Sequence, residues 1–231
     1  MISSPEKIQR GMQQQLLTWR NSKTKQDHRL GWKIGFNMVS DQQRLKLPSA
    51  MVGYLSRENE LSSGQLYHKT EDSKLLVEPE IAIQIGRDID AGISHAEATS
   101  AISAYAAALE LVDTTRSVAD DIEAVLAGNL FHECVILAEQ RVMPTDYQRN
   151  ELAFSLTLNG EPARSLEQER VPHDFSTIIV DTARILAAHD EQLQAGDWII
   201  TGSAATPLAV TSGDQILLDM QALGKIALSI D

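Results

Sequence analysis

Two glutamates, Glu78 and Glu80, stand near the start of the apolar run VEPEIAIQIG, which spans Val77 to Gly86. Side chains alternate between the two faces of a strand, so both carboxylates point to the same face. Like charges side by side repel each other unless a cation lies between them or solvent screens them. The pair therefore indicates either a solvated strand face or a bound cation.

A third glutamate, Glu110, lies between Leu109 and Leu111 in another predicted strand, LELVD. A carboxylate among leucines is unexpected unless its strand face is polar. Three convergent carboxylates with water would make a hard oxygen site suited to Mg²⁺ or Mn²⁺, with positions left for substrate oxygens. Taken alone, the spacing favours the solvated face, because exposed acidic strand faces outnumber metal sites.

Other polar residues lie beside apolar runs. Lys33 in GWKIG either extends to solvent or sits in a pocket as an anion binder or proton shuttle. The turn TGS, which follows the strand GDWIIT, could aim backbone N–H groups and a hydroxyl at a carboxylate or carbonyl oxygen. Asn129 and His132 in GNLFHEC are minor candidates, since a lone His–Glu pair is more often structural.

Composition narrows the class of protein. The 231 residues are 43% hydrophobic, which is enough for the core of one substantial domain. A formal net charge of -12 without a dense Lys/Arg cluster argues against a nucleic-acid partner. The single cysteine, Cys134, excludes an intrachain disulfide and a multi-cysteine zinc site. No run has the length of a membrane span and the N-terminus does not resemble a signal peptide, so we expect a cytoplasmic protein without a membrane partner.

The elements that must position the site follow one another irregularly. Caps and apolar spacing predict helices over residues 5–20, 96–109 and 175–189, a short helix over 41–47, and a helix or loop over 118–130. Apolar runs predict strands over 31–36, 75–85, 109–113, 132–139, 152–158 and 196–201, and a C-terminal hairpin turning near 222–224. Asn159-Gly160 predicts another hairpin. Because Pro79 cannot donate a ladder hydrogen bond, we expect an irregularity or an unpaired edge there.

This order predicts an α+β fold with a folded sheet, sandwich or roll, and no glycine-rich phosphate loop is present. We assign the N-terminal helix, the lysine-bearing strand and a possible cover over the site to residues 1–74. Residues 75–231 then hold the core that carries the three candidate metal-binding glutamates, in one continuous fold.

Several segments in this order resemble the hydratase/decarboxylase branch of the fumarylacetoacetate hydrolase superfamily. They are GWKIG, VEPEIAIQIGRDI, LELVDTTRS, AGDWIITGS and SGDQILLDMQALG, and the resemblance covers roughly residues 5–231. It implies a mixed β-sandwich roll with a few flanking helices, and a lyase for a small 2-oxo or 2-hydroxy-dienoic acid, similar to 2-oxopent-4-enoate hydratase. Decarboxylation of the 4-oxalocrotonate type and C–C hydrolysis of an acylpyruvate are alternatives. A non-catalytic partner subunit or small-acid binding protein is the alternative of another class.

The resemblance also implies roles, position by position. Mg²⁺ or Mn²⁺ would bind to Glu78, Glu80 and Glu110, and the carboxylate and 2-oxo oxygen of the acid would chelate it, which stabilises an enolate. Lys33 would move protons between tautomers. The turn formed by Thr201, Gly202 and Ser203 would hold the substrate. Members of this family are commonly homo-oligomers.

The chain departs from the family pattern outside the glutamates. Where these enzymes commonly have Pro-Asp-Phe-Gly, this chain reads Ala50-Met51-Val52-Gly53, so an acidic group is missing. An expected Asp-Asn pair is Gly128-Asn129, and the Gly-Ser turn continues as SAATP. These changes spare the predicted metal site and affect the part expected to decide between adding water and losing CO₂.

Overall fold

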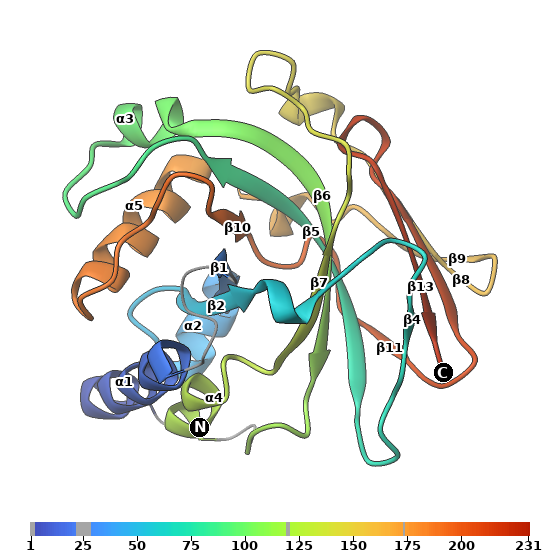
Figure 1. Cartoon of the computed structure of the whole chain (residues 1–231), viewed down its shortest axis with the longest axis horizontal. Helices are drawn as coiled ribbons and strands as arrows, with labels where there is room; N and C mark the ends of the chain where they lie inside the picture. The colour runs from blue at the N-terminus through green and yellow to red at the C-terminus, as the bar shows by residue number, and fades with distance from the viewer. Residues whose placement is uncertain (1–2, 22–28, 119–120, 173) are drawn as a thin grey trace.

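The computed structural model describes residues 3–21, 29–118, 121–172 and 174–231, and their strands form two sheets (Figure 1). The larger sheet is mixed, with the order β2-β1-β10-β5-β6-β7-β3 and with β11 also paired to β5. Its parallel pairs are β1 with β10 and β3 with β7. The strands of this sheet are β1 (Arg29–Gly35), β2 (Met51–Ser56), β3 (Glu60–Leu61), β5 (Leu75–Ile85), β6 (Ile102–Asp113), β7 (His132–Leu137), β10 (Trp198–Ile200) and β11 (Leu208–Val210).

The smaller sheet has the order β4-β13-β12-β8-β9. Its strands are β4 (Leu66–Tyr67), β8 (Ser155–Leu158), β9 (Glu161–Ser165), β12 (Gln215–Asp219) and β13 (Lys225–Ile230). Leu156 and Leu218 of this sheet share one core cluster with Leu109 and Leu111 of β6. The two sheets therefore pack against each other through apolar side chains, as in a sandwich.

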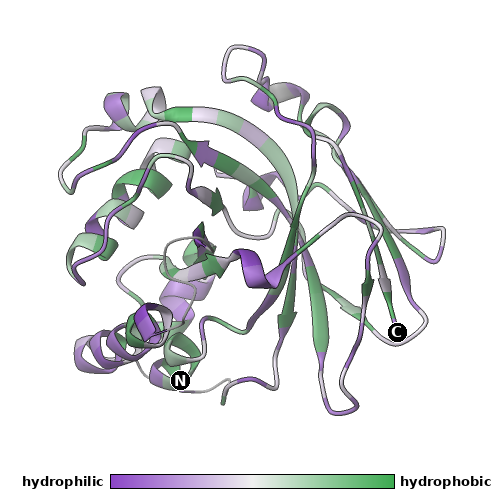
Figure 2. Cartoon of the chain, viewed as in Figure 1, coloured by the Kyte–Doolittle hydropathy of each residue, from purple (hydrophilic) through white to green (hydrophobic). Residues whose placement is uncertain are grey.

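Helices cover the rest of the larger sheet. They are α1 (Pro5–Asn21), α2 (Val39–Leu45), α3 (His95–Ser100), α4 (Ile122–Ala127) and α5 (Phe175–Ala187), with short 3₁₀ turns at η1 (Arg57–Asn59), η2 (Arg149–Glu151), η3 (Gln168–Arg170) and η4 (Gln221–Leu223). Figure 2 shows that hydrophobic residues follow the strands while α1 is largely hydrophilic outside its buried face. Within the part of the chain that the structure describes, no helix is long and apolar enough to cross a membrane.

The larger sheet curls on itself. Leu55 of β2 and Val135 of β7 belong to one cluster of buried residues, although their strands lie toward opposite ends of the sheet. The larger sheet curves into a half-barrel, which brings residues of such distant strands into one cluster (Figure 1). Three alanines of β6 (Ala104, Ala106 and Ala108) join this cluster, because small side chains fit the narrow interior.

The helix predicted over residues 96–109 is wrong beyond Ser100. The predicted capping box of Ser94 and Glu97 is present at the start of α3, but β6 begins at Ile102. Alanine favours helices, yet Ala106 and Ala107 are fully buried in a strand with β5 and β7 on either side. Burial on both faces outweighs helix propensity here, as it does in central strands generally.

Most other predicted elements are confirmed, and so is the α+β class. The helices over 5–20 and 175–189 are α1 and α5, and the strand over 75–85 is β5. Asn159 and Gly160 form the tight turn between β8 and β9, both with positive φ. Strand β11 was not predicted, since its Leu208–Val210 run is too short to show alternation.

Candidate metal centre

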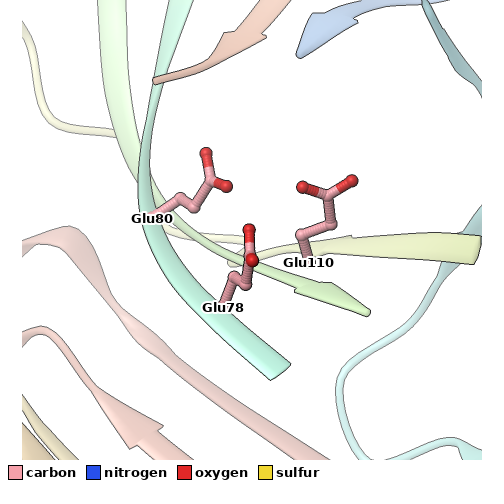
Figure 3. A group of neighbouring side chains, drawn as sticks. All are labelled: Glu78, Glu80 and Glu110. Atoms are coloured by element: carbon pink, nitrogen blue, oxygen red, sulfur yellow. The ribbon is translucent and has the colours of Figure 1, made fainter. Parts of the chain in front are cut away.

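The pairing of β5 with β6 brings the three glutamates together. Glu78 lies directly opposite Glu110, and Glu80 lies two residues along β5 on the same face (Figure 3). One carboxylate oxygen from each residue lies within 4.8 Å of the others. Glu80 and Glu110 are 0% exposed, and Glu78 is half-buried. The solvated-face interpretation of the pair therefore does not hold in the structure.

Lys33 reaches the same place from β1, which does not pair with β5 directly. Lys33 lies opposite Ile200 of β10, and Ile200 lies opposite Ala82 of β5, so the lysine shares the face of the glutamates. It is 3% exposed. Its Nζ donates hydrogen bonds to Glu110 Oε1 at 2.5 Å and to the carbonyl oxygen of Leu130 at 3.1 Å. Lys33 is thus a buried ammonium in the site.

The charges of the cluster are unequal. Burial, and after it the charge of Glu110, raises the pKa of Glu78 to about 7. Burial and the same charge raise the pKa of Glu80 well above its ordinary value. Burial would also raise the pKa of Glu110, but Lys33 and His132 outweigh it and lower that pKa. Without a cation, the site therefore favours the charged form of Glu110 and the protonated form of Glu80, while Glu78 titrates near neutral pH.

Two buried carboxylate oxygens in this cluster have no hydrogen-bond partner among the residues that the structure describes. Glu80 Oε2 accepts from the Gly202 backbone N–H at 2.7 Å, while its Oε1 is buried without a partner. Glu110 Oε1 accepts from Lys33, while its Oε2 is likewise buried and unpartnered. An unsatisfied buried carboxylate oxygen is costly, and a bound cation removes that cost. All-oxygen ligands of this kind suit Mg²⁺ or Mn²⁺, so the residues present fit a divalent cation.

His132 supports Glu110 from β7. Its Nδ1 lies 2.7 Å from Glu110 Oε1, and because a carboxylate only accepts, Nδ1 carries the hydrogen. Burial lowers the pKa of His132, which favours the neutral ring. Its Nε2 is buried without a partner in the described part of the chain, and the structure places this minor candidate beside Glu110.

Asn129 has a different position from His132. Its Oδ1 accepts from the Tyr54 backbone N–H at 2.9 Å and from Gln15 Nε2 at 3.1 Å, and its Nδ2 donates to the Tyr54 carbonyl at 3.0 Å. Asn129, Leu130 and Phe131 all have φ between 54° and 62°, a left-handed turn that non-glycine residues rarely form. Asn129 therefore clamps a strained turn whose Leu130 carbonyl accepts from Lys33.

The turn of Thr201, Gly202 and Ser203 directs only part of its polar groups at the site. The Thr201 hydroxyl donates to the Ile81 carbonyl at 3.0 Å, and the Ser203 hydroxyl donates to the Ala205 carbonyl at 2.7 Å. Gly202 has a φ of 94°, and a Cβ on it would lie 2.3 Å from Asn37 Nδ2. The structure thus places Gly202 against Glu80, with both hydroxyls bonded within the protein.

Pro79 lies where one neighbour of β5 ends and another begins. Strand β10 pairs with residues 82–84 of β5, and β11 pairs with residues 75–77. Between these two stretches, the segment after β10 donates backbone hydrogen bonds to the carbonyls of Pro79 and Ile81. A residue in a strand points its N–H and C=O to the same side. The absent N–H of Pro79 therefore faces this gap, and the β6 ladder on the other side is continuous. The expected interruption is present on one side of the strand.

A cavity of about 250 Å³ opens in front of Glu78. Its lining includes predicted residues, namely Lys33, Glu78, Gly202 and Ser203, but not Thr201. The lining also includes residues that were not predicted, among them Asn37, Met38, Phe131 and Arg170. These four lie in loops or a 3₁₀ turn, whose sequences carry no periodic signal, while Asp41 of the lining lies in the first turn of α2. Met51, at the position of the missing acid, is 3% exposed and belongs to the apolar core.

Comparison with known proteins identifies the family. Residues 19–230 match the model of the fumarylacetoacetate (FAA) hydrolase C-terminal family. A 4-oxalocrotonate decarboxylase of Pseudomonas sp. is 24% identical over 212 residues, which cover 87% of this chain and 78% of the relative. A 2-keto-4-pentenoate hydratase of Paraburkholderia xenovorans (strain LB400) is 25% identical over 201 residues, which cover 85% of this chain and 74% of the relative.

Solved structures share the fold. The 4-oxalocrotonate decarboxylase from Pseudomonas putida G7, complexed with magnesium and adipate, has a TM-score of 0.85 at 19% identity and aligns over 94% of this chain and 83% of its own. The fumarylpyruvate hydrolase from Pseudomonas aeruginosa, in complex with Mn²⁺ and pyruvate, has a TM-score of 0.68 at 14% identity, over 86% of this chain and 88% of its own. The resemblance seen in the sequence is confirmed: the chain is an enzyme of the fumarylacetoacetate hydrolase family, among its hydratase and decarboxylase homologues.

Proposed function

We propose that this enzyme is a divalent-metal-dependent lyase that acts on a small 2-oxo or 2-hydroxy-dienoic acid, with hydration of the 2-oxopent-4-enoate type as the leading reaction. The observation that carries the proposal is the pair of unpartnered, buried oxygens on Glu80 and Glu110. They belong to a triad of carboxylates beside a buried lysine. The hydratase and decarboxylase names of the relatives support the proposed reaction class.

In this proposal Glu78, Glu80 and Glu110 hold Mg²⁺ or Mn²⁺. The bound ion would supply a Lewis acid that stabilises negative charge developing on a 2-oxo acid. Gly202 and His132 orient two of the carboxylates through the hydrogen bonds to Glu80 and Glu110. The cavity of about 250 Å³ has room for a small acid.

Lys33 would be the group that moves a proton. An ammonium has three donors, and the structure engages Lys33 Nζ with two acceptors, Glu110 and the Leu130 carbonyl. The third donor is available to the cavity that Lys33 lines. We therefore assign Lys33 to proton transfer between tautomers of the acid, which general acid–base catalysis by a positioned side chain can accelerate.

A turnover assay tests the proposal and separates the related reactions. The purified enzyme is given 2-hydroxypentadienoate, 4-oxalocrotonate or an acylpyruvate, with Mg²⁺, with Mn²⁺, or with a chelator. We expect metal-dependent turnover of at least one acid, and the acid consumed identifies hydration, decarboxylation or C–C hydrolysis. Lys33→Met should bind the metal but lose turnover. No turnover of any acid by a metal-loaded protein would refute the proposal.

A further inference from the structure

Helix α1 buries one side chain that carries an amide group. Gln15 is 0% exposed, and the other buried residues of this helix are Gly11, Met12, Leu16 and Trp19. The Oε1 atom of Gln15 is buried and has no hydrogen-bond partner in the described part of the chain. An unsatisfied buried oxygen costs stability, and an apolar side chain of similar length would avoid that cost. Packing alone therefore does not account for a glutamine at this position.

The amide of Gln15 has a defined orientation. Asn129 bonds to both backbone groups of Tyr54, since its Oδ1 accepts from the N–H at 2.9 Å and its Nδ2 donates to the carbonyl at 3.0 Å. These two bonds fix which end of the Asn129 amide is the oxygen. That oxygen lies 3.1 Å from Gln15, so Gln15 must present its Nε2 donor there. Gln15 therefore supplies a second donor to Asn129 Oδ1.

Helix α1 is held against α4, the helix that leads into the turn with Asn129 (Figure 1). A Cβ added to Gly11 would lie 2.7 Å from Leu126 Cβ, so the two helices are in close contact. Arg10 also pairs with Glu123 of α4 at 2.6 Å. The backbone that carries Gln15 is therefore fixed relative to the start of the turn, and its side chain bonds to the turn from a defined place.

The turn of residues 129–131 connects this bond to Lys33. Its three residues have left-handed φ values, a conformation that persists only when the surrounding structure supports it. The Leu130 carbonyl in its middle accepts from Lys33 Nζ at 3.1 Å. Gly53, opposite Lys33 on β2, lets the two side chains approach, because a Cβ there would lie 2.7 Å from Asn129 Oδ1 and 2.8 Å from Lys33 Cγ. A displacement of Asn129 would therefore move an acceptor of the Lys33 ammonium.

We propose that Gln15 is a positioning residue for Lys33. Gln15 does not belong to the described lining of the metal cavity, so it acts through Asn129. Its bond keeps the turn in place, and the Leu130 carbonyl then holds the ammonium so that the remaining donor of Lys33 faces the cavity. The inference rests on the proposed function for the role of Lys33 in proton transfer. The position of the ammonium, however, can be measured in the metal-free protein without turnover.

Gln15→Met separates positioning from stability. Methionine has a similar length without the amide, so the urea midpoint of unfolding should stay the same or rise when the unsatisfied oxygen is removed. In metal-free protein labelled with ¹⁵N-lysine, the buried ammonium should give its own NMR signal, which Lys33→Met identifies by its loss. We expect this signal to shift and broaden in Gln15→Met. The kcat should fall about 3- to 10-fold, as one hydrogen bond allows, with KM and Mg²⁺ affinity unchanged within about twofold.

Met12→Val is the matched control, because Met12 is buried on the same helix and packs in the apolar core. It should lower the urea midpoint and leave the Lys33 signal and kcat unchanged, which is the reverse of Gln15→Met. The double variant of Gln15→Met with Asn129→Ala should have the same kcat as Asn129→Ala alone, because the two residues act through one hydrogen bond.

A wild-type Lys33 signal in Gln15→Met, or additive losses of kcat in the double variant, would overturn the inference. If the wild-type enzyme turns over no acid, the proposed function fails, and the Lys33 signal alone still decides whether Gln15 positions the ammonium.

Discussion

The two sides of the cavity are built in opposite ways. The strand wall consists of Glu78, Glu80 and Glu110, which an unbroken antiparallel ladder brings together. The loop wall consists of Asn37, Met38, Phe131 and Arg170, which lie outside strands in loops and a 3₁₀ turn. In a strand ladder, side chains on one face are fixed at every second residue, whereas loops tolerate changes in sequence and in backbone path.

Because of this difference, we expect the strand wall to bind the metal and the loop wall to select the substrate. A ligand set on paired strands keeps its spacing as long as the sheet exists, so it suits chemistry that a family shares. Loops can change without disturbing the sheet, so they suit the choice of substrate. We therefore expect substitutions in the strand wall to affect metal binding strongly, and those in the loop wall to affect stability and acid binding.

Glu110→Gln should have the largest effect. Glutamine keeps an acceptor for Lys33 but removes the charge, so the affinity for Mg²⁺ should fall more than about 100-fold, since even outer-shell changes at metal sites cost 10- to 100-fold. The buried Lys33 ammonium would lose its counter-charge, which costs about 3–5 kcal/mol of unfolding free energy. Calorimetry with Mg²⁺ and urea unfolding measure the two effects, and Glu78→Gln should also abolish binding.

The control for this substitution is Glu139→Gln, an exposed acid outside the site. It should leave both measurements unchanged. If Glu110→Gln binds Mg²⁺ as tightly as the control does, the assignment of the strand wall is wrong.

Gly202→Ala should have the next largest effect, because Gly202 contacts both walls. Its backbone N–H bonds to Glu80 of the strand wall, and it lies against Asn37 of the loop wall. A Cβ there meets Asn37 at 2.3 Å and the φ of 94° is strained for alanine, so we expect a loss of about 2–5 kcal/mol in unfolding free energy. The hydrogen bond to Glu80 would also be disturbed, which should weaken Mg²⁺ binding.

Gly196→Ala separates strain from contact. Gly196 has a φ of 92°, but a Cβ added to it would meet nothing within 4 Å, so only the conformational cost of about 1–2 kcal/mol applies. Thermal and urea unfolding of both variants measure the difference. Equal losses of unfolding free energy in the two variants would show that Asn37 moves away from the new methyl group at little cost, and that Gly202 does not couple the two walls.

Asn129→Ala should damage the loop wall more than the strand wall. It removes three hydrogen bonds from a buried residue in the left-handed region, at a cost of about 2–3 kcal/mol. Asn159→Ala is the matched control, because Asn159 has a φ of 54° and two side-chain bonds at an exposed hairpin. Both variants should keep Mg²⁺ affinity within about twofold, and only Asn129→Ala should lower turnover. A large loss of Mg²⁺ affinity in Asn129→Ala would contradict the separation of the walls.

The smallest effect expected is a pH dependence of metal binding. Burial and Glu110 raise the pKa of Glu78 to about 7, and the protonated carboxyl must lose its proton before it binds a cation. Below pH 7, the affinity for Mg²⁺ should fall about tenfold per pH unit, or about 1.4 kcal/mol. In the metal-free protein, the contribution of this group to stability is present at low pH and is lost as the pH rises through 7.

Two measurements check this sign. Mg²⁺ should raise the unfolding temperature more at pH 8 than at pH 6, and calorimetry in buffers of different ionisation enthalpy should detect proton release near pH 6.5. A Mg²⁺ effect that is the same at both pH values, with no proton released, would place the pKa values of both Glu78 and Glu80 near their ordinary range.

The strand wall could be anticipated from the sequence, and the loop wall could not. The period of two in VEPEIAIQIG places Glu78 and Glu80 on one face, and the opposite placement of Glu110 follows from strand pairing. Arg170 lies in LEQER, a polar run typical of a solvated surface, and only its tie to Glu167 and Thr206 brings it to the cavity. The hydrogen bonds of the Thr201 and Ser203 hydroxyls could not be predicted either, because both donate to backbone carbonyls that only the folded structure brings near them.

The helix wrongly predicted over residues 96–109 has a related cause. Local propensity describes alanine in isolation, whereas the half-barrel interior selects it for size. The same alanine-rich run leads directly to Glu110, so the sequence pattern predicts a strand of five residues around the third glutamate where the structure has one of twelve.

Strand β10 has a consequence for how the protein is made. Among the described strands, it alone links β1, which carries Lys33, to β5 in the larger sheet. During synthesis the glutamate strands can pair as a hairpin early, but Ile200 must leave the ribosome before Lys33 can be aligned with them. Pairing across such a separation is slow, so we expect the carboxylates to remain hydrated in the nascent chain and the buried ion pair to form late. The synthesis of the three-residue strand β10 thus determines when the buried ion pair between Lys33 and Glu110 can form.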